Sequence, residues 1–298
     1  MITLSRCPVC DGERSRPKYH KFGLPLVACT DCGLVFANPR LTPEQIWERY
    51  NPEYFRKEYL PSLGVVDGRV DLDYFDARNG AMLRFIARHR RPPGRLIEVG
   101  AGGGFFLKSA ERAGWSVAGI EISTEGVAFA TSRLGLDVRC ESAEQLGFPP
   151  ASADVAVMFD VIEHLLDPVA ALERVRTVLK PGGVLVVSTP NVEALTHTAL
   201  GSEWAVLSPA EHLYNFSAST LAHLLRRCGF RDTRQECHYE GLGVYETMNP
   251  RYSHAPSSAR NKAYAMFVST IGAVVHRQVQ AMGKADVLLM TAVTPAGA

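Results

Sequence analysis

The feature that most constrains the fold is a glycine-rich turn that joins a short apolar run to a helical pattern. Leu96-Ile97-Glu98-Val99 runs into Gly100-Ala101-Gly102-Gly103-Gly104, and the next apolar run ends near Glu121. Glycines at the carboxyl end of a buried strand let the backbone approach a ligand beside a helix N-terminus. A carboxylate 21 residues after the first glycine can accept hydrogen bonds from ribose hydroxyls. The pattern predicts a Rossmann-like unit that binds a ribose-bearing ligand.

The same alternation of apolar runs and helical patterns continues along the chain, which indicates an α/β fold with a doubly wound, mostly parallel sheet. We expect strands at Arg95–Val99, Ser116–Ile122, Val155–Met158, Val184–Ser188, Phe230–His238 and Val287–Val293. We expect helices at Phe105–Arg112, Thr124–Leu134, Pro168–Leu179 (capped by Asp167), Ser217–Cys228 and near Ala259–Met282. Residues 94–298 are therefore assigned to one core domain.

Residues 41–93 are expected to form a helical connector and cap before this core. Thr42-Pro43-Glu44-Gln45 has the residues of a capping box with proline at the first helical position. A second helix is expected from about Tyr74 to Arg90, ended by Pro92-Pro93.

The glycine turn differs from a dinucleotide-binding fingerprint. That fingerprint requires Gly or Ala at its sixth position, where this chain has Phe105. A turn without that residue suggests a nucleoside that carries no pyrophosphate.

The motifs in this region resemble those of class I S-adenosylmethionine-dependent methyltransferases over about residues 75–240. The resemblance rests on Glu98–Gly104, Gly119-Ile120-Glu121, Ser142-Ala143-Glu144, Asp154–Leu165 and Leu179–Gly183. It implies a seven-stranded sheet whose last strand is antiparallel, with S-adenosylmethionine as cofactor. It also implies a set of cofactor-binding residues: Glu98, Gly100, Gly102, Gly104, Glu121, Ser142, Ala143, Glu144, Phe159 and Asp160. The family often has Asp at the position of Ser142.

Four of the seven cysteines fall in the first 32 residues, as two CxxC pairs. Cys7 and Cys10 are separated from Cys29 and Cys32 by 18 residues, a spacing typical of a zinc ribbon. Four thiolates fill a tetrahedral site, so the expected zinc is structural rather than catalytic. We expect residues 1–40 to form this zinc-binding domain. Cys140, Cys228 and Cys237 are interpreted as packing thiols.

The methyl acceptor is expected beside the fourth strand. Asp160, Glu163 and His164 would share one face of a helix if a helix began there. A similar acid-acid-histidine set binds a divalent metal in ubiquinone-type O-methyltransferases. The alternative is that Glu163 and His164 simply pack and hydrogen-bond, although both remain candidate substrate contacts.

A long loop after the fifth strand is a second candidate acceptor region, because such loops carry substrates in these folds. Asn191, Trp204 and Tyr214 are its candidate substrate contacts. Glu211 and His212 form a titratable pair, with His212 as candidate general base assisted by Glu211. The loop resembles that of bacterial sugar C-methyltransferases, which join a four-cysteine zinc domain to this core and place a Glu-His pair at the acceptor. Those enzymes carry a further C-terminal domain, and this chain ends at Ala298. A structural role for His212 stays open.

These features together predict a methyltransferase acting on a small molecule such as a sugar or secondary-metabolite intermediate. The alternatives are a ubiquinone-type or phenolic O-methyltransferase using a metal at Asp160, Glu163 and His164, an RNA methyltransferase using the zinc ribbon, and a non-catalytic binding protein. The net charge of +1 argues against nucleic acid. With no signal peptide or membrane span recognised, we expect a cytoplasmic monomer or dimer.

Overall fold

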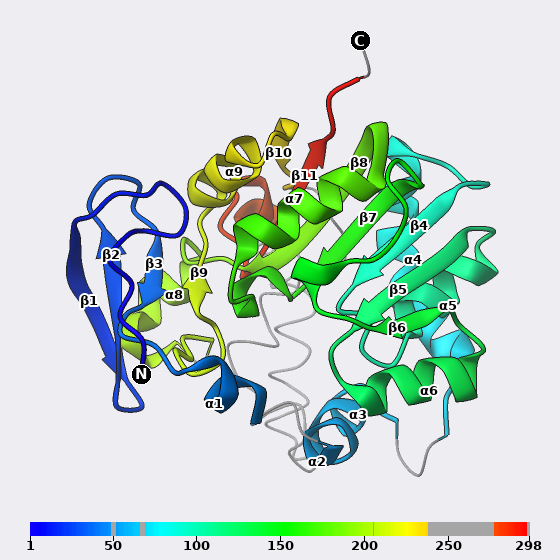
Figure 1. Cartoon of the computed structure of the whole chain (residues 1–298), viewed down its shortest axis with the longest axis horizontal. Helices are drawn as coiled ribbons and strands as arrows, with labels where there is room; N and C mark the ends of the chain where they lie inside the picture. The colour runs from blue at the N-terminus through cyan, green and yellow to red at the C-terminus, as the bar shows by residue number, and fades with distance from the viewer. Residues whose placement is uncertain (49–51, 66–68, 205, 238–276, 297–298) are drawn as a thin grey trace.

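The computed structural model describes residues 1–48, 52–65, 69–204, 206–237 and 277–296. Within them, two sheets lie side by side: a small one at the N-terminus and a large one in the core (Figure 1). No helix of the described residues is long and apolar enough to cross a membrane. The part of the expected helix at 259–276 lies outside the described residues, and residues 277–281 are helical.

The large sheet has seven strands in the order β10-β11-β8-β7-β4-β5-β6. β11 runs antiparallel to β8 and β10, while the other neighbours are parallel, as the resemblance implied. The strands are β4 (Arg95–Val99), β5 (Ser116–Glu121), β6 (Val138–Cys140), β7 (Ala153–Phe159), β8 (Leu179–Pro190), β10 (Arg231–Gln235) and β11 (Val287–Val293). Helices follow the strands along the chain: α5 (Phe105–Arg112), α6 (Thr124–Leu134), α7 (Pro168–Val178), α8 (Leu195–Leu200) and α9 (Ala218–Arg227).

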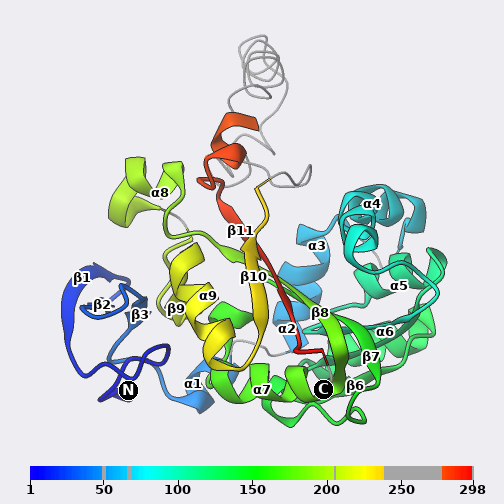
Figure 2. The same ribbon diagram turned by 90° about the horizontal axis from the view of Figure 1, so that it is seen from above.

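The two faces of this sheet carry separate apolar cores. Alternate residues such as Ile97 and Met158 pack with α7 and α9, whereas Leu96 and Val157 pack with α5, α6 and α4 (Leu72–His89). Figure 2 shows these helices on opposite sides of the sheet. Both layers are needed because a central parallel strand is apolar on both faces.

The connector between the two sheets is helical. It comprises α1 (Pro43–Trp47), α2 (Pro52–Tyr54), the π-helix η2 (Phe55–Tyr59), α3 (Leu60–Ser62) and α4. Thr42 and Gln45 form the predicted capping box of α1.

The N-terminal sheet has the order β1-β2-β3-β9, from β1 (Ser15–Lys21), β2 (Leu24–Cys29), β3 (Val35–Ala37) and β9 (Tyr214–Asn215). Three strands come from the cysteine-containing segment, and the fourth comes from the loop that precedes α9. The two parts of the chain therefore share one sheet, which neither strand length nor periodicity in the sequence indicated.

Candidate active site

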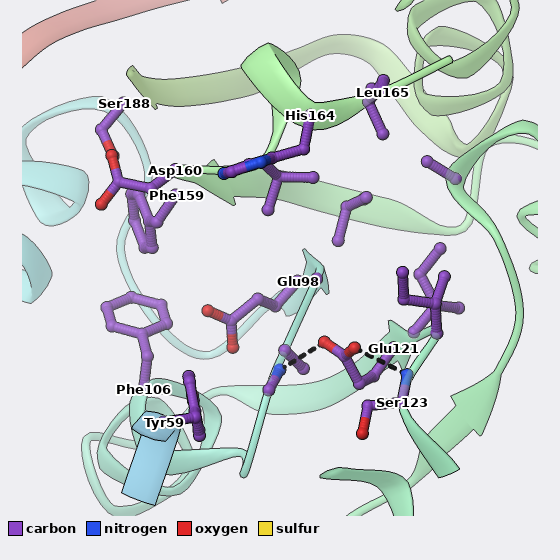
Figure 3. A pocket seen from close by; sticks show the side chains of 18 of the residues that line it. Tyr59, Glu98, Phe106, Glu121, Ser123, Phe159, Asp160, His164, Leu165 and Ser188 are labelled. Atoms are coloured by element: carbon purple, nitrogen blue, oxygen red, sulfur yellow. Dashed lines mark hydrogen bonds between the residues drawn. The ribbon is translucent and has the colours of Figure 1, made fainter. Parts of the chain in front are cut away.

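A cavity of about 700 Å³ opens at the carboxyl ends of β4, β5 and β7. Its walls come from the glycine turn, from the segments after β5, β6 and β7, and from the connector helices. This is the edge at which open parallel sheets bind their ligands. Figure 3 shows Glu98, Glu121, Asp160 and His164 around it.

The glycine turn forms the floor of the cavity in a conformation that side chains disfavour. Gly100, Gly102 and Gly104 have φ of 75°, 53° and 80°. A Cβ on Gly100 would collide with Val161, and one on Gly102 with the Tyr59 hydroxyl. Gly104 differs because it does not line the cavity, and its missing Cβ lets the start of α5 pack against Ala130 and Leu136. The expected direct contact of Gly104 with a cofactor does not fit this placement.

Glu121 is held rigidly at the end of β5. Its two carboxylate oxygens accept hydrogen bonds from the Gly102 and Ser123 amides, each at 2.8 Å (Figure 3). Burial raises its pKa, and these amides oppose the rise. Each oxygen keeps a second lone pair that a ligand hydroxyl can use.

Glu98 is a buried carboxyl group of the cavity wall with an unpaired oxygen. It is 5% exposed, and its Oε2 has no hydrogen-bond partner in the described structure. Burial raises its pKa well above the usual value, and repulsion from Glu121 is a second, smaller cause. An orphaned buried carboxyl oxygen suits a cationic ligand group.

Other predicted cofactor contacts also line the cavity. Ser142, Ala143 and Glu144 do so at the start of the 3-10 turn η3 (Ala143–Gln145). Phe159 packs edge-to-face on Phe106 with ring centroids 4.9 Å apart. Asp160 has a φ of 53° and accepts a hydrogen bond from Ser188 at 3.2 Å, and burial raises its pKa.

The acid-acid-histidine set is arranged differently from expectation. No helix begins at Asp160, because Asp167 and Pro168 start α7 and leave only the 3-10 turn η4 (Ile162–His164) before it. The ligand atoms of Glu163, His164 and His212 lie within 4.8 Å of one another, and Asp160 is outside that group. Glu163 is 1% exposed; its Oε2 accepts from Thr189 at 2.9 Å and its Oε1 has no hydrogen bond.

His212 lies across from His164, with ring centroids 4.8 Å apart. Its Nδ1 is 2.7 Å from the Val206 carbonyl oxygen. Because a carbonyl oxygen only accepts, Nδ1 carries the proton, and the neutral ring keeps its lone pair on Nε2. Burial lowers the pKa of His212, while the Val206 bond and the charge of Glu211 oppose this. A backbone carbonyl therefore orients the ring, and Glu211 acts on it through its charge.

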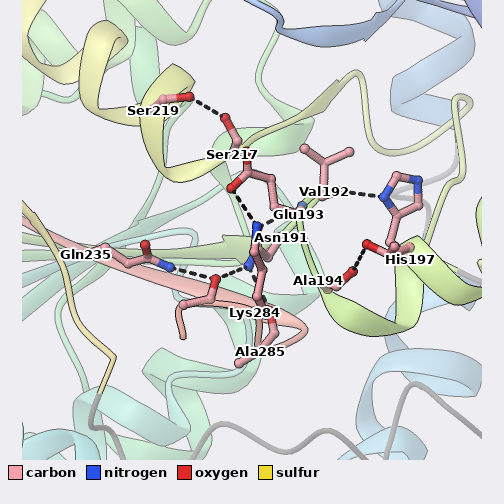
Figure 4. A network of polar contacts seen from close by, with 12 residues as sticks. Asn191, Val192, Glu193, Ala194, His197, Ser217, Ser219, Gln235, Lys284 and Ala285 are labelled. Carbon is pink, nitrogen blue, oxygen red and sulfur yellow. Dashed lines mark hydrogen bonds and ion pairs between the residues drawn. The ribbon is translucent and has the colours of Figure 1, made fainter. Parts of the chain in front are cut away.

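Three predicted substrate contacts do not reach the cavity. The Asn191 amide donates to the carbonyls of Gly283 and Ala285, at 3.1 and 2.9 Å (Figure 4). Trp204 is fully buried against the N-terminal sheet, and Tyr214 donates to the Leu166 carbonyl at 3.1 Å. These three side chains pack between segments of the chain, so they do not form the expected walls of the acceptor site.

Two aromatic contributors were missed in the sequence. The Tyr59 hydroxyl accepts from the Gly103 amide at 3.2 Å, and its ring stacks on Phe55 at 5.2 Å. The i, i+4 spacing of this pair in the connector was a readable signal. The connector therefore forms a wall of the cavity.

The four N-terminal cysteines gather as the spacing predicted. Their sulfurs lie within 4.8 Å of one another, and Cys7–Cys32 and Cys10–Cys29 are each 3.6 Å apart. Zinc–sulfur bonds of about 2.3 Å place tetrahedral sulfurs about 3.8 Å apart. The donor set and its spacing fit one such ion.

Comparisons with known proteins agree with this geometry. A family described as "Methyltransferase domain" matches residues 74–235. A ubiquinone biosynthesis O-methyltransferase of Parvibaculum lavamentivorans is 32% identical over 144 residues, covering 45% of this chain and 57% of that protein. The chain therefore spans less than two thirds of that relative.

Two further similarities extend over more of the chain. A probable S-adenosylmethionine-dependent methyltransferase of Mycolicibacterium smegmatis is 31% identical over 197 residues, 64% of this chain and 74% of that protein. The crystal structure of a SAM-dependent methyltransferase from Archaeoglobus fulgidus matches with a TM-score of 0.51 at 17% identity, covering 82% of this chain and all of the other. That structural likeness shows the fold alone.

Proposed function

This chain belongs to the methyltransferase domain family of class I S-adenosylmethionine-dependent enzymes, and we propose that it methylates a small-molecule acceptor from which His212 removes a proton. The methyl donor, when bound, supplies a methyl group already activated on a sulfonium. The protein then has to align the acceptor and remove its proton.

The cavity residues fit this donor. The orphaned Glu98 oxygen suits its ammonium group, and the lone pairs of Glu121 suit its ribose hydroxyls. Gly100 and Gly102 leave room for close approach to the backbone. We assign Ser142, Ala143 and Glu144 to the adenine, and Phe159 and Asp160 to the adjoining wall.

The observation that carries the mechanism is the 2.7 Å contact between the His212 Nδ1 and the Val206 carbonyl oxygen. Val206 fixes the proton on Nδ1, which leaves the Nε2 lone pair for an acceptor. No described residue hydrogen-bonds that Nε2, and burial keeps the ring neutral at neutral pH. Glu211 raises the basicity of the ring through its charge.

The acceptor is proposed to be a sugar or secondary-metabolite intermediate with an ionisable hydroxyl or C–H group. The four cysteines are proposed to hold a structural zinc, as in the sugar-modifying enzymes that this chain resembles. We retain the division into a cysteine unit (1–40), connector (41–93) and core (94–298), with β9 of the core completing the sheet of the cysteine unit.

The test compares His212→Ala with His223→Ala, which removes an exposed histidine on α9. Turnover is followed as adenosylhomocysteine release with a keto-sugar nucleotide and with catechol as probe acceptors. His212→Ala should lose at least ~100-fold in kcat, the effect of removing a general base, and retain donor affinity. His223→Ala should match the wild type. Equal kcat in the two variants would contradict the assignment.

A metal-assisted phenolic O-methyltransferase is the second candidate function. It is favoured by the Glu163, His164 and His212 cluster, in which the Glu163 Oε1 lacks a hydrogen bond. Such a set matches ligands used by divalent cations. In that case His212 is a ligand and no longer a base.

Divalent ions separate the two candidates. The metal-assisted reaction predicts catechol turnover that stops with chelator and returns with Mg²⁺ or Mn²⁺, and that is lost in Glu163→Gln. General-base catalysis by His212 predicts turnover that is unchanged by a chelator too weak to remove the cysteine-bound ion.

A further inference from the structure

The cysteine unit and the acceptor side of the cavity are joined through one backbone segment. The Leu213 carbonyl accepts from the Ala37 amide at 2.9 Å, and the Leu213 amide donates to the Glu163 carbonyl at 2.8 Å. β3 then pairs with β9 through Val35–Asn215 and Phe36–Tyr214 (Figure 1). The residue after His212 is therefore fixed from the cysteine unit on one side and from the Glu163–His164 turn on the other.

Arg40 makes the second connection between the same three segments. Its Nη1 donates to the Tyr214 hydroxyl at 2.7 Å, and its Nη2 donates to the Leu166 carbonyl at 3.2 Å. Leu166 belongs to the loop that carries His164 and lines the cavity, and Tyr214 is two residues after His212. One guanidinium thus links the loop of each histidine to the end of the cysteine unit.

Burying the charge of Arg40 costs free energy, which suggests that this residue has a geometric role. Arg40 is 8% exposed, and no ion pair joins it to a carboxylate among the described residues. A buried cation held only by neutral acceptors is a poor source of stability compared with apolar packing. A planar fork that reaches two loops at once does, however, set their separation.

We propose that Arg40 is a positioning residue, which holds the His164 loop and the His212 segment at the spacing that the acceptor site requires. The cysteine unit is then a template for the acceptor side and has no part in binding the donor. This inference rests on the proposed function only for the role of His212.

A matched arginine provides the control. Arg227 also fastens the cysteine unit to the core, through the Val9 carbonyl at 2.9 Å and an ion pair to Asp11 at 2.6 Å. It lies on α9 and does not line the cavity. A purely structural clamp should therefore be equally sensitive at Arg227 and Arg40.

The test uses the full-length protein with Arg40→Met, Arg40→Lys and Arg227→Met. A misplacement of about 1 Å can cost ~100-fold in rate, so Arg40→Met should lose ~10- to 100-fold in kcat/KM with whichever probe acceptor the wild type uses. Arg40→Lys should recover part of this. Donor affinity and zinc content should stay within ~2-fold, and Arg227→Met should keep wild-type kinetics.

An NMR experiment tests the positioning role of Arg40 even if neither probe acceptor is methylated. Ring-nitrogen NMR signals of His164 and His212, assigned with alanine variants, should move in Arg40→Met and stay in place in Arg227→Met. Unmoved signals in Arg40→Met would overturn the proposal, as would equal shifts or equal kinetic losses in both variants. Loss of zinc or of donor binding in Arg40→Met would also overturn it.

Discussion

The two sides of the cavity are built in opposite ways. Most of the donor side is formed by consecutive elements, β4 to η3, within residues 95–145, and Tyr59, Phe159 and Asp160 complete it. The acceptor side gathers residues from three distant places, as the hydrogen bond between Arg40 and Tyr214 spans 174 positions. A donor shared by a whole family can be held by a local motif, whereas an acceptor site depends on how separate units are joined. The two sides should therefore fail independently.

Among changes outside the cavity, the largest effect is expected from dismantling the cysteine unit. Cys29→Ser/Cys32→Ser removes the pair next to β3, so the strand that holds Leu213 should lose its order. We expect kcat/KM to fall ~100-fold, the scale of a misplaced site, with donor affinity within ~2-fold by calorimetry. Cys140→Ser is the control, because Cys140 is exposed and is not the packing thiol that the sequence suggested. A parallel loss of donor affinity would break the proposed separation.

A glycine exchange tests the donor side. Gly102→Ala places a Cβ against the Tyr59 hydroxyl, whereas Gly135→Ala, at a similar positive φ of 68°, meets open space. Both variants carry backbone strain of about 1–2 kcal/mol. Only Gly102→Ala should weaken donor binding, by ~10-fold or more, which corresponds to about 1.4 kcal/mol. Equal affinities would show that the turn does not contact the donor.

A smaller gain is expected at Ser142. Ser142→Asp introduces the residue that is frequent in the family at the edge of the adenine region. One additional hydrogen bond to a charged group should tighten donor binding by a few-fold, on the order of 1 kcal/mol. Unchanged or weaker binding would place the adenine away from η3.

The smallest effect is in the pH profile. Burial lowers the pKa of His212, and only the neutral ring accepts a proton, so the acid limb of kcat should lie below pH 6.5. The charge of Glu211 raises this pKa, so Glu211→Gln should shift the limb further to acid. A limb above pH 6.5, or a shift to alkaline pH, would assign it to another group.

The sequence predicted the donor side well because its determinants are local. Strand β4 and helices α5 and α6 have the predicted limits, and Asp167 caps α7 as expected. Strands as short as β6 and β9 carry too few residues for a period to be read. The short turn at Glu163 follows from the start of α7 at Pro168, which leaves no room for the helix expected there.

The acceptor side could be predicted only as a set of residue types. His212 and Glu163 were recognised, but their meeting depends on the Leu213 backbone contacts. Trp204 and Tyr214 look like substrate walls in a loop, yet the N-terminal sheet covers them. Nothing local in the sequence reveals a pairing partner more than 170 residues away.

The most direct measurement is a joint determination of donor affinity and turnover in Glu121→Ala and His212→Ala. We expect Glu121→Ala to lose donor binding, whereas His212→Ala should bind the donor as the wild type does and fail in transfer. If His212→Ala lost donor binding as well, or if Glu121→Ala retained it, the separation of the two sides would be contradicted.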